Sequence, residues 1–419
     1  MLLLVAILAV RSFSVGGSDA PEVASLAPAR GLDAEFVIPQ QDGYVLAGIA
    51  GEAQPGDDRL CSGRFALVSL NENGSPRRAL LASAPERDRF CAKSLTSAFR
   101  QETGEWVVSG FATRYAEPSR FYPLGPSSDT QTYVLRLTDD GEPDPSFGER
   151  GVVRGAFLVG RAGETYVTNR LERVTADGDV RDDLLEVQES VYHSWSGVVA
   201  ERDTVVVFDA GLPLSFQTFE ADDPRSPSRL RALTPQPNYP ERTIELGNAL
   251  FNWHDVALHG GRLYVVLEGR KSRIVAADAR EGRLATSFGQ RGAVPFLAED
   301  YVAGAALTID DRGRLVVAFS TIAPSRYSLH LRRFSKDGVL DREFGGLVRQ
   351  GESEISVTDV LVDAAERIVV LDRFGAAVTR VTPEGRLDPT FGRGGVVSLA
   401  DVAVCQLAAA RRNPACLKR

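Results

Sequence analysis

The sequence predicts an all-β fold, a seven-bladed β-propeller with four-stranded antiparallel blades. One motif recurs four times, and a hairpin pattern recurs seven times with an average spacing of about 54 residues from Gly43 to Glu366. A period of this length that carries two hairpins, and so four strands, is typical of a propeller blade. We expect the propeller over residues 30–399, after an N-terminal segment at 1–29 and before a tail at 400–419.

The repeated motif is a turn followed by an aromatic residue, as in "EGRLDPTFGRGGVV" from Glu384. Its turn glycine permits a positive φ and precedes a phenylalanine by six residues in every copy. A catalytic motif is rarely needed four times in one chain, so we interpret these residues as structural anchors and expect the phenylalanines to be buried. The anchors are Gly141, Gly282, Gly338 and Gly385 with Phe147, Phe288, Phe344 and Phe391.

The second pattern is a strand, a polar turn and a bulky apolar strand, as in "FVIPQQDGYVLAG" from Phe36. Three further turns, near Gly74, Gly178 and Asp223, lack the Phe-Gly pair. The Pro- and Ser-rich stretches at 114–130 and 221–243 are interpreted as long loops within the repeat units. The seven predicted hairpin turns lie at Gly43, Gly104, Gly163, Asp203, Gly261, Gly313 and Glu366.

With these residues described, the sequence resembles the delta-60 repeat of bacterial secreted proteins. That unit reads roughly as strand, "DG", "VV", strand, "DGSLDxSFG", "GG". The match is specific in four units, degraded in three, and covers about residues 30–399. The resemblance implies a propeller-like repeat array and brings no settled activity.

The N-terminus predicts export. Residues 2–10 are nine apolar residues, too few to span a bilayer at about 1.5 Å per residue, so they are interpreted as a signal-peptide core within residues 1–29. The cleavage point stays open. We therefore expect a secreted, periplasmic or cell-surface protein without a membrane span in its mature chain.

The four cysteines suit two disulfides in an exported chain, with three possible connectivities. Cys61 and Cys91 flank strands of the first units, whereas Cys405 and Cys416 lie in the C-terminal tail, so local pairing within each set is favoured. The chain has no C-x-x-C motif, which argues against a redox or zinc role.

Composition excludes several function classes. The net charge of -8 and the lack of a basic cluster argue against a nucleic-acid partner. Four histidines are too few for a histidine-rich metal centre, and the common nucleotide, hydrolase and metalloprotease motifs are absent. We expect no metal and no cofactor, and a monomer.

The best candidate ligand site is a pair of tryptophans that enter consecutive units at the same spacing. Trp195 lies three residues before Val198, and Trp253 three before Val256. If first strands line a channel, both indoles would lie near one mouth and could bind a small polar ligand or sugar. Packing between blades is the alternative. The candidate ligand-binding residues are His193, Trp195, Trp253, His254 and Asp255.

The predicted function is a binding or interaction module for a protein or a small polar or carbohydrate ligand. The alternative is a propeller enzyme, a lyase, lactonase or other hydrolase, with its site in the central channel. An enzyme should bring several acids or histidines from different blades to the channel with perturbed pKa values. A third interpretation, a segment of a larger surface assembly, requires a large exposed apolar patch.

We also expect the ring to close by strand pairing, with "GGVVSL" from Gly394 lying beside the N-terminal strands around Phe36. The first unit lacks a preceding Phe-Gly-valine element, while the last unit carries one. Closure of this kind would remove two exposed sheet edges.

Overall fold

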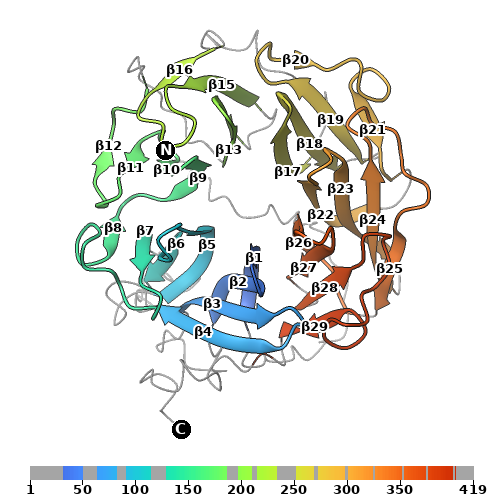
Figure 1. Ribbon diagram of the computed structural model, residues 1–419, viewed down its shortest axis with the longest axis horizontal. Coiled ribbons are helices and arrows are strands. Elements are labelled where there is room, and N and C mark those ends of the chain that lie inside the picture. Colours follow the sequence, from blue (N-terminus) through green and yellow to red (C-terminus); the bar gives the residue numbers. More distant parts are fainter. Residues whose placement is uncertain are drawn as a thin grey trace, which may run out of the picture.

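A computed structural model shows a closed ring of seven blades, each a small antiparallel sheet (Figure 1). The predicted seven-bladed propeller is therefore confirmed. The structure describes residues 32–50, 64–82, 91–114, 129–185, 197–209, 215–233, 252–268, 272–297, 301–323, 326–351, 353–373, 376–399 and 402.

Blades 1 to 4 occupy the first half of the ring, and in each blade the strands pair in chain order from the centre outward. Blade 1 contains β1 (Leu32–Gln40), β2 (Gly43–Ala50), β3 (Arg64–Asn71) and β4 (Pro76–Ala82). Blade 2 contains β5 (Cys91–Arg100), β6 (Trp106–Arg114), β7 (Asp129–Leu137) and β8 (Val152–Arg154). Blade 3 contains β9 (Leu158–Ala162), β10 (Thr165–Thr168), β11 (Arg173–Val174) and β12 (Val180–Arg181). Blade 4 contains β13 (Gly197–Glu201), β14 (Thr204–Asp209), β15 (Ser215–Ala221) and β16 (Leu230–Ala232).

Blades 5 to 7 complete the ring. Blade 5 contains β17 (Asn252–His259), β18 (Arg262–Glu268), β19 (Arg273–Asp278), β20 (Arg283–Leu284) and β21 (Ala293–Pro295), and both β20 and β21 pair with β19. Blade 6 contains β22 (Tyr301–Ile309), β23 (Leu315–Ala323), β24 (Arg326–Phe334) and β25 (Gly346–Gly351). Blade 7 contains β26 (Val357–Val362), β27 (Ile368–Asp372), β28 (Ala377–Val381) and β29 (Val396–Ser398).

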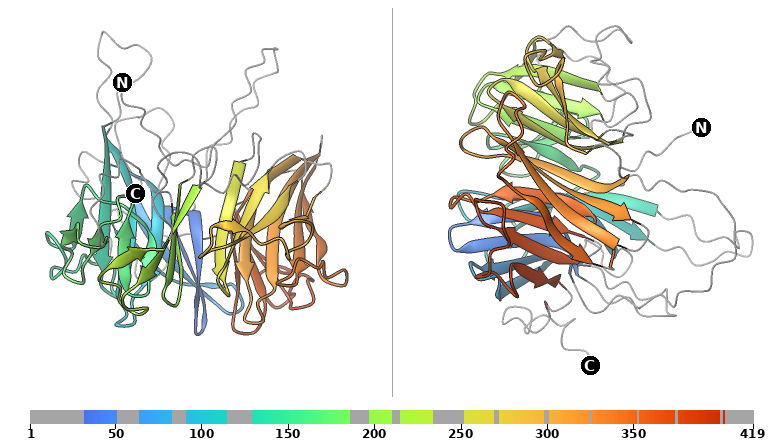
Figure 2. Two further views of the ribbon diagram at one scale, coloured as in Figure 1. Left: turned by 90° about the horizontal axis from the view of Figure 1, so that it is seen from above. Right: turned by 90° about the vertical axis from the view of Figure 1, so that its right-hand side faces the viewer.

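The alternating strand directions give the ring two different faces (Figure 2). One face, here called the turn face, carries the tight turn between the first and second strand of every blade. All seven predicted turn positions, Gly43 to Glu366, lie at these turns. The opposite face, here called the loop face, is where each first strand begins.

The repeated motif builds an Arg–Asp–Phe box in blades 2, 6 and 7. In blade 7 the Arg380 Nε donates to Asp388 Oδ2 at 2.8 Å, and the guanidinium carbon lies 4.5 Å from the centre of the Phe391 ring. Arg380 also donates to the carbonyl of Glu72 in blade 1. The box therefore fixes the motif internally and ties it to the next blade. The equivalent residues are Arg136, Asp144 and Phe147 in blade 2, and Arg333, Asp341 and Phe344 in blade 6.

All four motif phenylalanines are buried, with 0–3% of each exposed. The aspartate three residues before the phenylalanine, present in three of the four copies, lies outside the strands. Instead Asp388 caps a single turn by accepting from the backbone N–H of Thr390, and Phe391 N donates to the Asp388 carbonyl. The glycine after the phenylalanine then turns the chain into the outermost strand.

Three turn glycines of the motif, Gly141, Gly338 and Gly385, lie against the neighbouring blade. Gly385 has φ +86°, and a Cβ built on it would lie 2.3 Å from the backbone N of Gly345 in blade 6. Gly178, one of the turns without its own Phe-Gly pair, stands in the same relation to Gly148 of blade 2. A turn glycine thus fits against the Phe-Gly pair of the blade before it, which explains why the turn is kept even where that pair is lost.

The predicted mode of closure is wrong. β29, which contains the "VVS" of "GGVVSL", pairs with β28 of its own blade, and Ala377 lies opposite Ser398. Blade 1 is likewise built entirely from consecutive strands. The contact between blade 7 and blade 1, here called the seam, is instead a packing interface.

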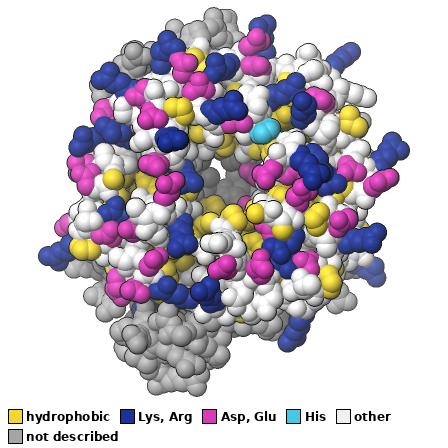
Figure 3. Space-filling model, viewed as in Figure 1, with side chains coloured by type: hydrophobic (Ala, Val, Ile, Leu, Met, Phe, Trp, Pro, Cys, Tyr) yellow, Lys and Arg dark blue, Asp and Glu magenta, His cyan; other side chains and the backbone are white. Residues whose placement is uncertain are grey.

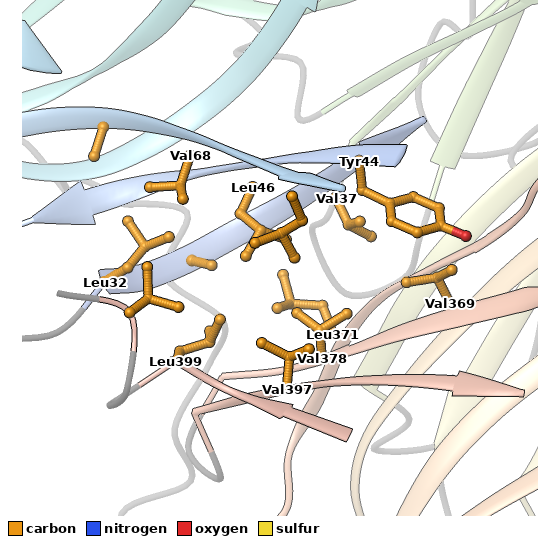
Figure 4. Packing of buried hydrophobic residues seen from close by; sticks show 14 of the residues in the cluster. Leu32, Val37, Tyr44, Leu46, Val68, Val369, Leu371, Val378, Val397 and Leu399 are labelled. Carbon is orange, nitrogen blue, oxygen red and sulfur yellow. The ribbon is translucent and has the colours of Figure 1, made fainter. Parts of the chain in front are cut away.

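The seam has a large apolar core (Figure 4). Side chains from β1 and β2, among them Leu32, Val37 and Leu46, point toward Leu371 and Val397 of blade 7. Tyr44 also packs edge-on against the Phe391 ring, with the ring centres 6.0 Å apart. The two blades bury this core without sharing a strand. β29 therefore helps to close the ring through its side chains and not through backbone pairing with blade 1.

The two stretches interpreted as long loops differ. Residues 115–128 lie outside the described residues, between β6 and β7. In the second stretch, residues 222–229 form a turn held by the Asp222 carboxylate, which accepts from the backbone N–H of Ser228 and Arg229. Strand β16 follows this turn, so the first part of the stretch is a turn and a short strand of blade 4, while residues 234–243 lie outside the described residues.

Candidate functional site

Three carboxylates lie on first strands, which line the inner edge of the ring (Figure 1). The surface is hollowed at the centre of the ring (Figure 3). The three carboxylates are Glu35 on β1, Asp255 on β17 and Asp359 on β26. Each lies at a β-bulge or directly after one. A bulge adds one residue to a strand and redirects the following side chains, which is common next to functional sites.

Asp255 bridges blades 5 and 6. Its Oδ1 accepts from the backbone N–H of Val256, and its Oδ2 from that of Leu307, both at 2.8 Å. Burial raises the pKa of Asp255 to about 7, helped by repulsion from Asp359. The side chain is nevertheless partly accessible to solvent, which places it at the inner edge of the interface rather than in its core.

Asp359 has the same role at the seam. Its Oδ2 accepts from the backbone N–H of Val37 in blade 1 at 2.8 Å. Burial raises the pKa of Asp359 to about 6. Within the described part of the chain, no lysine, arginine or histidine forms an ion pair with Asp255 or Asp359.

Glu35 bridges blades 1 and 2. Its Oε2 accepts from the backbone N–H of Leu95 at 2.5 Å, and its Oε1 from Ser94 Oγ at 3.0 Å. Burial raises the pKa of Glu35 to about 7, although Arg373, 3.1 Å away, opposes this shift. The arginine also binds Asp33 through two contacts of 2.8 Å.

A carboxylate is not required for this bridging. Between blades 2 and 3, the Ser109 hydroxyl accepts from the backbone N–H of Leu158 at 2.9 Å. Ser109 lies on the second strand β6, so here a neutral hydroxyl from another position links the two blades without the cost of desolvating a charge. The three carboxylates therefore add negative charge at the inner edge that the architecture itself does not demand.

The structure describes one of the five predicted site residues in full. Trp253 and His254 belong to β17, but their side chains lie outside the described residues, as do His193 and Trp195 entirely. A bulge between Trp253 and Asp255 shifts the strand register by one residue. The ligand-binding role of these residues stays a prediction.

The other predictions on undescribed segments also stay open. Cys61, Cys405 and Cys416 lie outside the described residues, and the side chain of Cys91 does as well. The export segment at 1–29 is also outside them. Among the described residues, no helix has the length and apolar character needed to cross a bilayer.

Sequence reasoning missed Glu35 and Asp359. The available signal was an acid three to five residues before the end of the first strand, in "DAEFVIPQ" and "VTDVLV". Acids in solvated turns are common in this chain. Without the strand register, Glu35 and Asp359 cannot be told apart from them in the sequence. The described residues contain no group of three or more His, Cys, Asp or Glu side chains arranged to hold a metal.

Neither a protein-family model nor a curated protein matches this sequence. Solved structures are similar to it at low identity. A streptogramin B lyase is 11% identical with a TM-score of 0.43, over 83% of this chain and 92% of that one. The virginiamycin B lyase from Staphylococcus aureus is 12% identical with a TM-score of 0.41, over 82% and 94%. A Trypanosoma rangeli sialidase is 10% identical with a TM-score of 0.40, over 85% and 54%. At these values the similarities carry no information on activity.

Proposed function

We propose that this chain is an exported ligand-binding propeller of the delta-60 repeat type. Its ligand is a small polar molecule bound at the inner edge of the ring, near the loop-face ends of β17, β26 and β1. The observation that supports this most is the carboxylate set of Glu35, Asp255 and Asp359, drawn from three blades. Backbone N–H groups orient these carboxylates. Because a neutral acceptor can also bridge two blades, bridging alone does not explain why these three positions carry acids.

The site favours a ligand that carries hydrogen-bond donors or a positive charge. Asp255 and Asp359 repel each other, so a donor or cation between blades 5 and 7 would relieve that repulsion. Trp253 and His254 precede Asp255 directly in the chain and supply stacking and hydrogen-bonding groups to the same strand. Sugars and small amines both fit this chemistry.

The test is calorimetric screening of oligosaccharides and small amines against wild type and Asp255→Asn. We expect at least one compound to bind wild type and to bind the variant about tenfold or more weakly, a loss of about 1.4 kcal/mol. Asp203→Asn, on the turn face at a half-exposed side chain that pairs with Arg280, is the matched control and should bind normally. Equal affinity in all three proteins would refute the proposed site.

The same carboxylates favour a second candidate, a propeller enzyme that uses acid–base chemistry. Acids from three blades with a pKa between about 6 and 7 meet the criterion set for an enzyme, because such groups exchange protons readily near neutral pH. In the same calorimeter a substrate would give continuous heat release instead of a saturable signal. Loss of that release in Asp255→Asn, with binding retained, would favour the enzyme.

A further inference from the structure

The outermost strand of blade 6 is longer than most of its counterparts. β25 runs over six residues, Gly346–Gly351, whereas β8, β21 and β29 have three residues each. Within the described part of the chain, β25 pairs with β24 alone, so its outer edge is open. Such an edge presents unpaired N–H and C=O groups to another strand. The other long outermost strand, β4, begins with Pro76 and two arginines, residues that protect an edge, whereas β25 contains no proline.

In three other blades a tight turn occupies a backbone carbonyl at the start of the outermost strand. Blade 2 has Glu149 and Arg150 in this turn, and the Glu149 N–H donates to the Val152 carbonyl at 2.8 Å. The N–H groups of Gln290 and Arg393 make the equivalent bond in blades 5 and 7. Blade 6 reads "FGGLV" where blade 2 reads "FGERGVV", so it lacks the two residues that form the turn. The start of β25 is therefore not covered in this way.

Blade 6 also carries most of the exposed large apolar side chains among the described residues. Six such side chains are exposed, and four of them belong to this blade: Ile322, Val339, Leu340 and Leu347. Leu340 lies opposite Phe334 and Leu347 opposite His330, so both flank β24 on the same side of the sheet. Phe334 belongs to the core shared with blade 5. The apolar side chains beside the open edge are therefore on the side of blade 6 that faces blade 5.

The same side of blade 6 carries positive charge. Arg326, His330 and Arg332 alternate along β24 and so share this side, and the Arg332 guanidinium lies 3.8 Å from a Cβ built on Gly346 of β25. Among the described residues, no acid forms an ion pair with Arg326 or Arg332. Residues 301–351 contain eight basic and five acidic residues, a formal charge of +3, although the whole chain has -8. This edge therefore complements an acidic partner, and two copies of it would repel each other.

We propose that β25 is a docking site for an extended acidic segment of another protein, which adds one more strand to blade 6. The backbone of that segment pairs with the open edge of β25. Its carboxylates bind Arg326 and Arg332, and its apolar side chains cover Leu347. β25 lies on the outer rim of the ring, away from the inner-edge carboxylates (Figure 1). The docking site is therefore independent of the small ligand proposed above.

The test is fluorescence anisotropy of the full chain with three short labelled peptides. One peptide alternates glutamate and valine, one alternates lysine and valine, and one is the acidic peptide with a central proline. We expect the first to bind about tenfold or more tightly than either of the others. Lysines would face the arginines of blade 6, and proline cannot donate a hydrogen bond to a strand edge. No binding of the acidic peptide, or equal binding of any two peptides that include it, would overturn the proposal.

Hydrogen exchange and variants then locate the bound peptide. The acidic peptide should protect the amides of β25 and leave those of β29, the outermost strand of blade 7, unchanged. Arg332→Glu should weaken binding about tenfold or more, whereas the matched control Arg386→Glu, at an exposed arginine of blade 7, should bind as wild type.

Unchanged affinity in Arg332→Glu contradicts the proposal. If that variant does not fold, Leu347→Ala should weaken binding, and a failure to do so contradicts the proposal equally. Dimerisation of the full chain that protects β25 without any peptide would identify a second copy as the occupant, and the proposed acidic partner would be wrong.

Discussion

At the scale of single residues, blade 5 lacks both the arginine and the aspartate of the Arg–Asp–Phe box, which indicates that these two residues depend on each other. Ala276 and Ala285 are joined by the same backbone bond that joins Arg380 and Asp388, so they occupy the positions of the missing arginine and aspartate. Both charged residues are thus absent together. Arg262, from β18, donates instead to the Lys336 carbonyl of blade 6 at 3.2 Å and to Ser287 Oγ at 3.1 Å.

This paired absence predicts strong coupling between Arg380 and Asp388. The side chains are 1% and 9% exposed, so removing either one leaves a buried charge without its partner. We expect each single alanine variant to lose about 3–5 kcal/mol of unfolding free energy. The double variant should lose less than the sum by more than about 1 kcal/mol. Urea unfolding of the four proteins measures this, and additive losses would show that the two residues act separately.

Phe391 should contribute mainly to stability. Its ring is fully buried between the Arg380 guanidinium and Tyr44 of blade 1. We expect Phe391→Ala to cost about 3–5 kcal/mol of unfolding free energy, because the cavity cannot fill. The measurement is urea unfolding together with a thermal melt. An unchanged melting temperature with lost ligand binding would instead identify the motif as a site.

At the scale of elements, most of the propeller could be predicted from the sequence. Five of the seven hairpins were predictable because their turns need a positive φ, which glycine adopts without strain. In the other two turns Arg202 and Glu366 take the positive φ, and there the polar turn between apolar strands was the signal. β16 was not predictable, since a three-residue edge strand after a Pro- and Ser-rich turn resembles a loop in sequence. The pairing of β29 was also missed, because apolar alternation does not say which strand is its neighbour.

Two turn glycines of blade 7 separate backbone strain from contact between blades. Gly385 and Gly394 have φ values of +86° and +62°, but a Cβ at Gly385 would meet the backbone of blade 6, while one at Gly394 would have nothing within 4 Å. We expect Gly394→Ala to cost about 1–2 kcal/mol, the ordinary penalty for this conformation. Gly385→Ala should cost clearly more, because a blade must shift. Chemical denaturation compares them, and equal costs would mean that the turn does not fit against its neighbour.

At the scale of the whole molecule, the same carboxylates that define the candidate site also set how stability depends on pH. Glu35, Asp255 and Asp359 have raised pKa values in the folded ring, so they stabilise it below their unfolded values and this contribution is lost as the pH rises toward about 7. Other acids act in the opposite sense. Although burial opposes it, hydrogen bonds from Ser228 and backbone N–H groups lower the pKa of Asp222 to about 2, so its contribution is lost as the pH falls below about 4.

Stability should therefore be greatest near pH 4, around the unfolded pKa values of these acids. Urea midpoints measured from pH 3 to pH 9 should fall on both sides of that value. The alkaline decline comes from the three inner carboxylates, and the acid decline from turn aspartates such as Asp222. A midpoint that rises steadily to pH 8 would mean that the inner carboxylates are well solvated in the folded ring.

The candidate site was only partly predictable for a physical reason. Asp255 was found because it follows two aromatic residues in the sequence, whereas Glu35 and Asp359 have no such marker. Their proximity depends on ring closure, which brings together residues more than 300 positions apart, as in the bond from Val37 N to Asp359. A single sequence contains the repeats that build the ring but does not show which inner-edge positions face each other.

Closure by packing predicts that the last apolar residue of the ring stabilises the whole of it. Leu399 is 1% exposed in the core shared by blades 7 and 1, although it lies after the last strand, and its backbone N–H donates to the Ala376 carbonyl at 2.6 Å. We expect Leu399→Ala to cost about 2–5 kcal/mol and to lower the melting temperature of the ring in one cooperative step. The matched control is Leu347→Ala, at a side chain of β25 that is 53% exposed, which should change unfolding by less than about 0.5 kcal/mol. If Leu399→Ala merely frays β29 while the other blades melt as in wild type, then the seam core does not hold the ring closed.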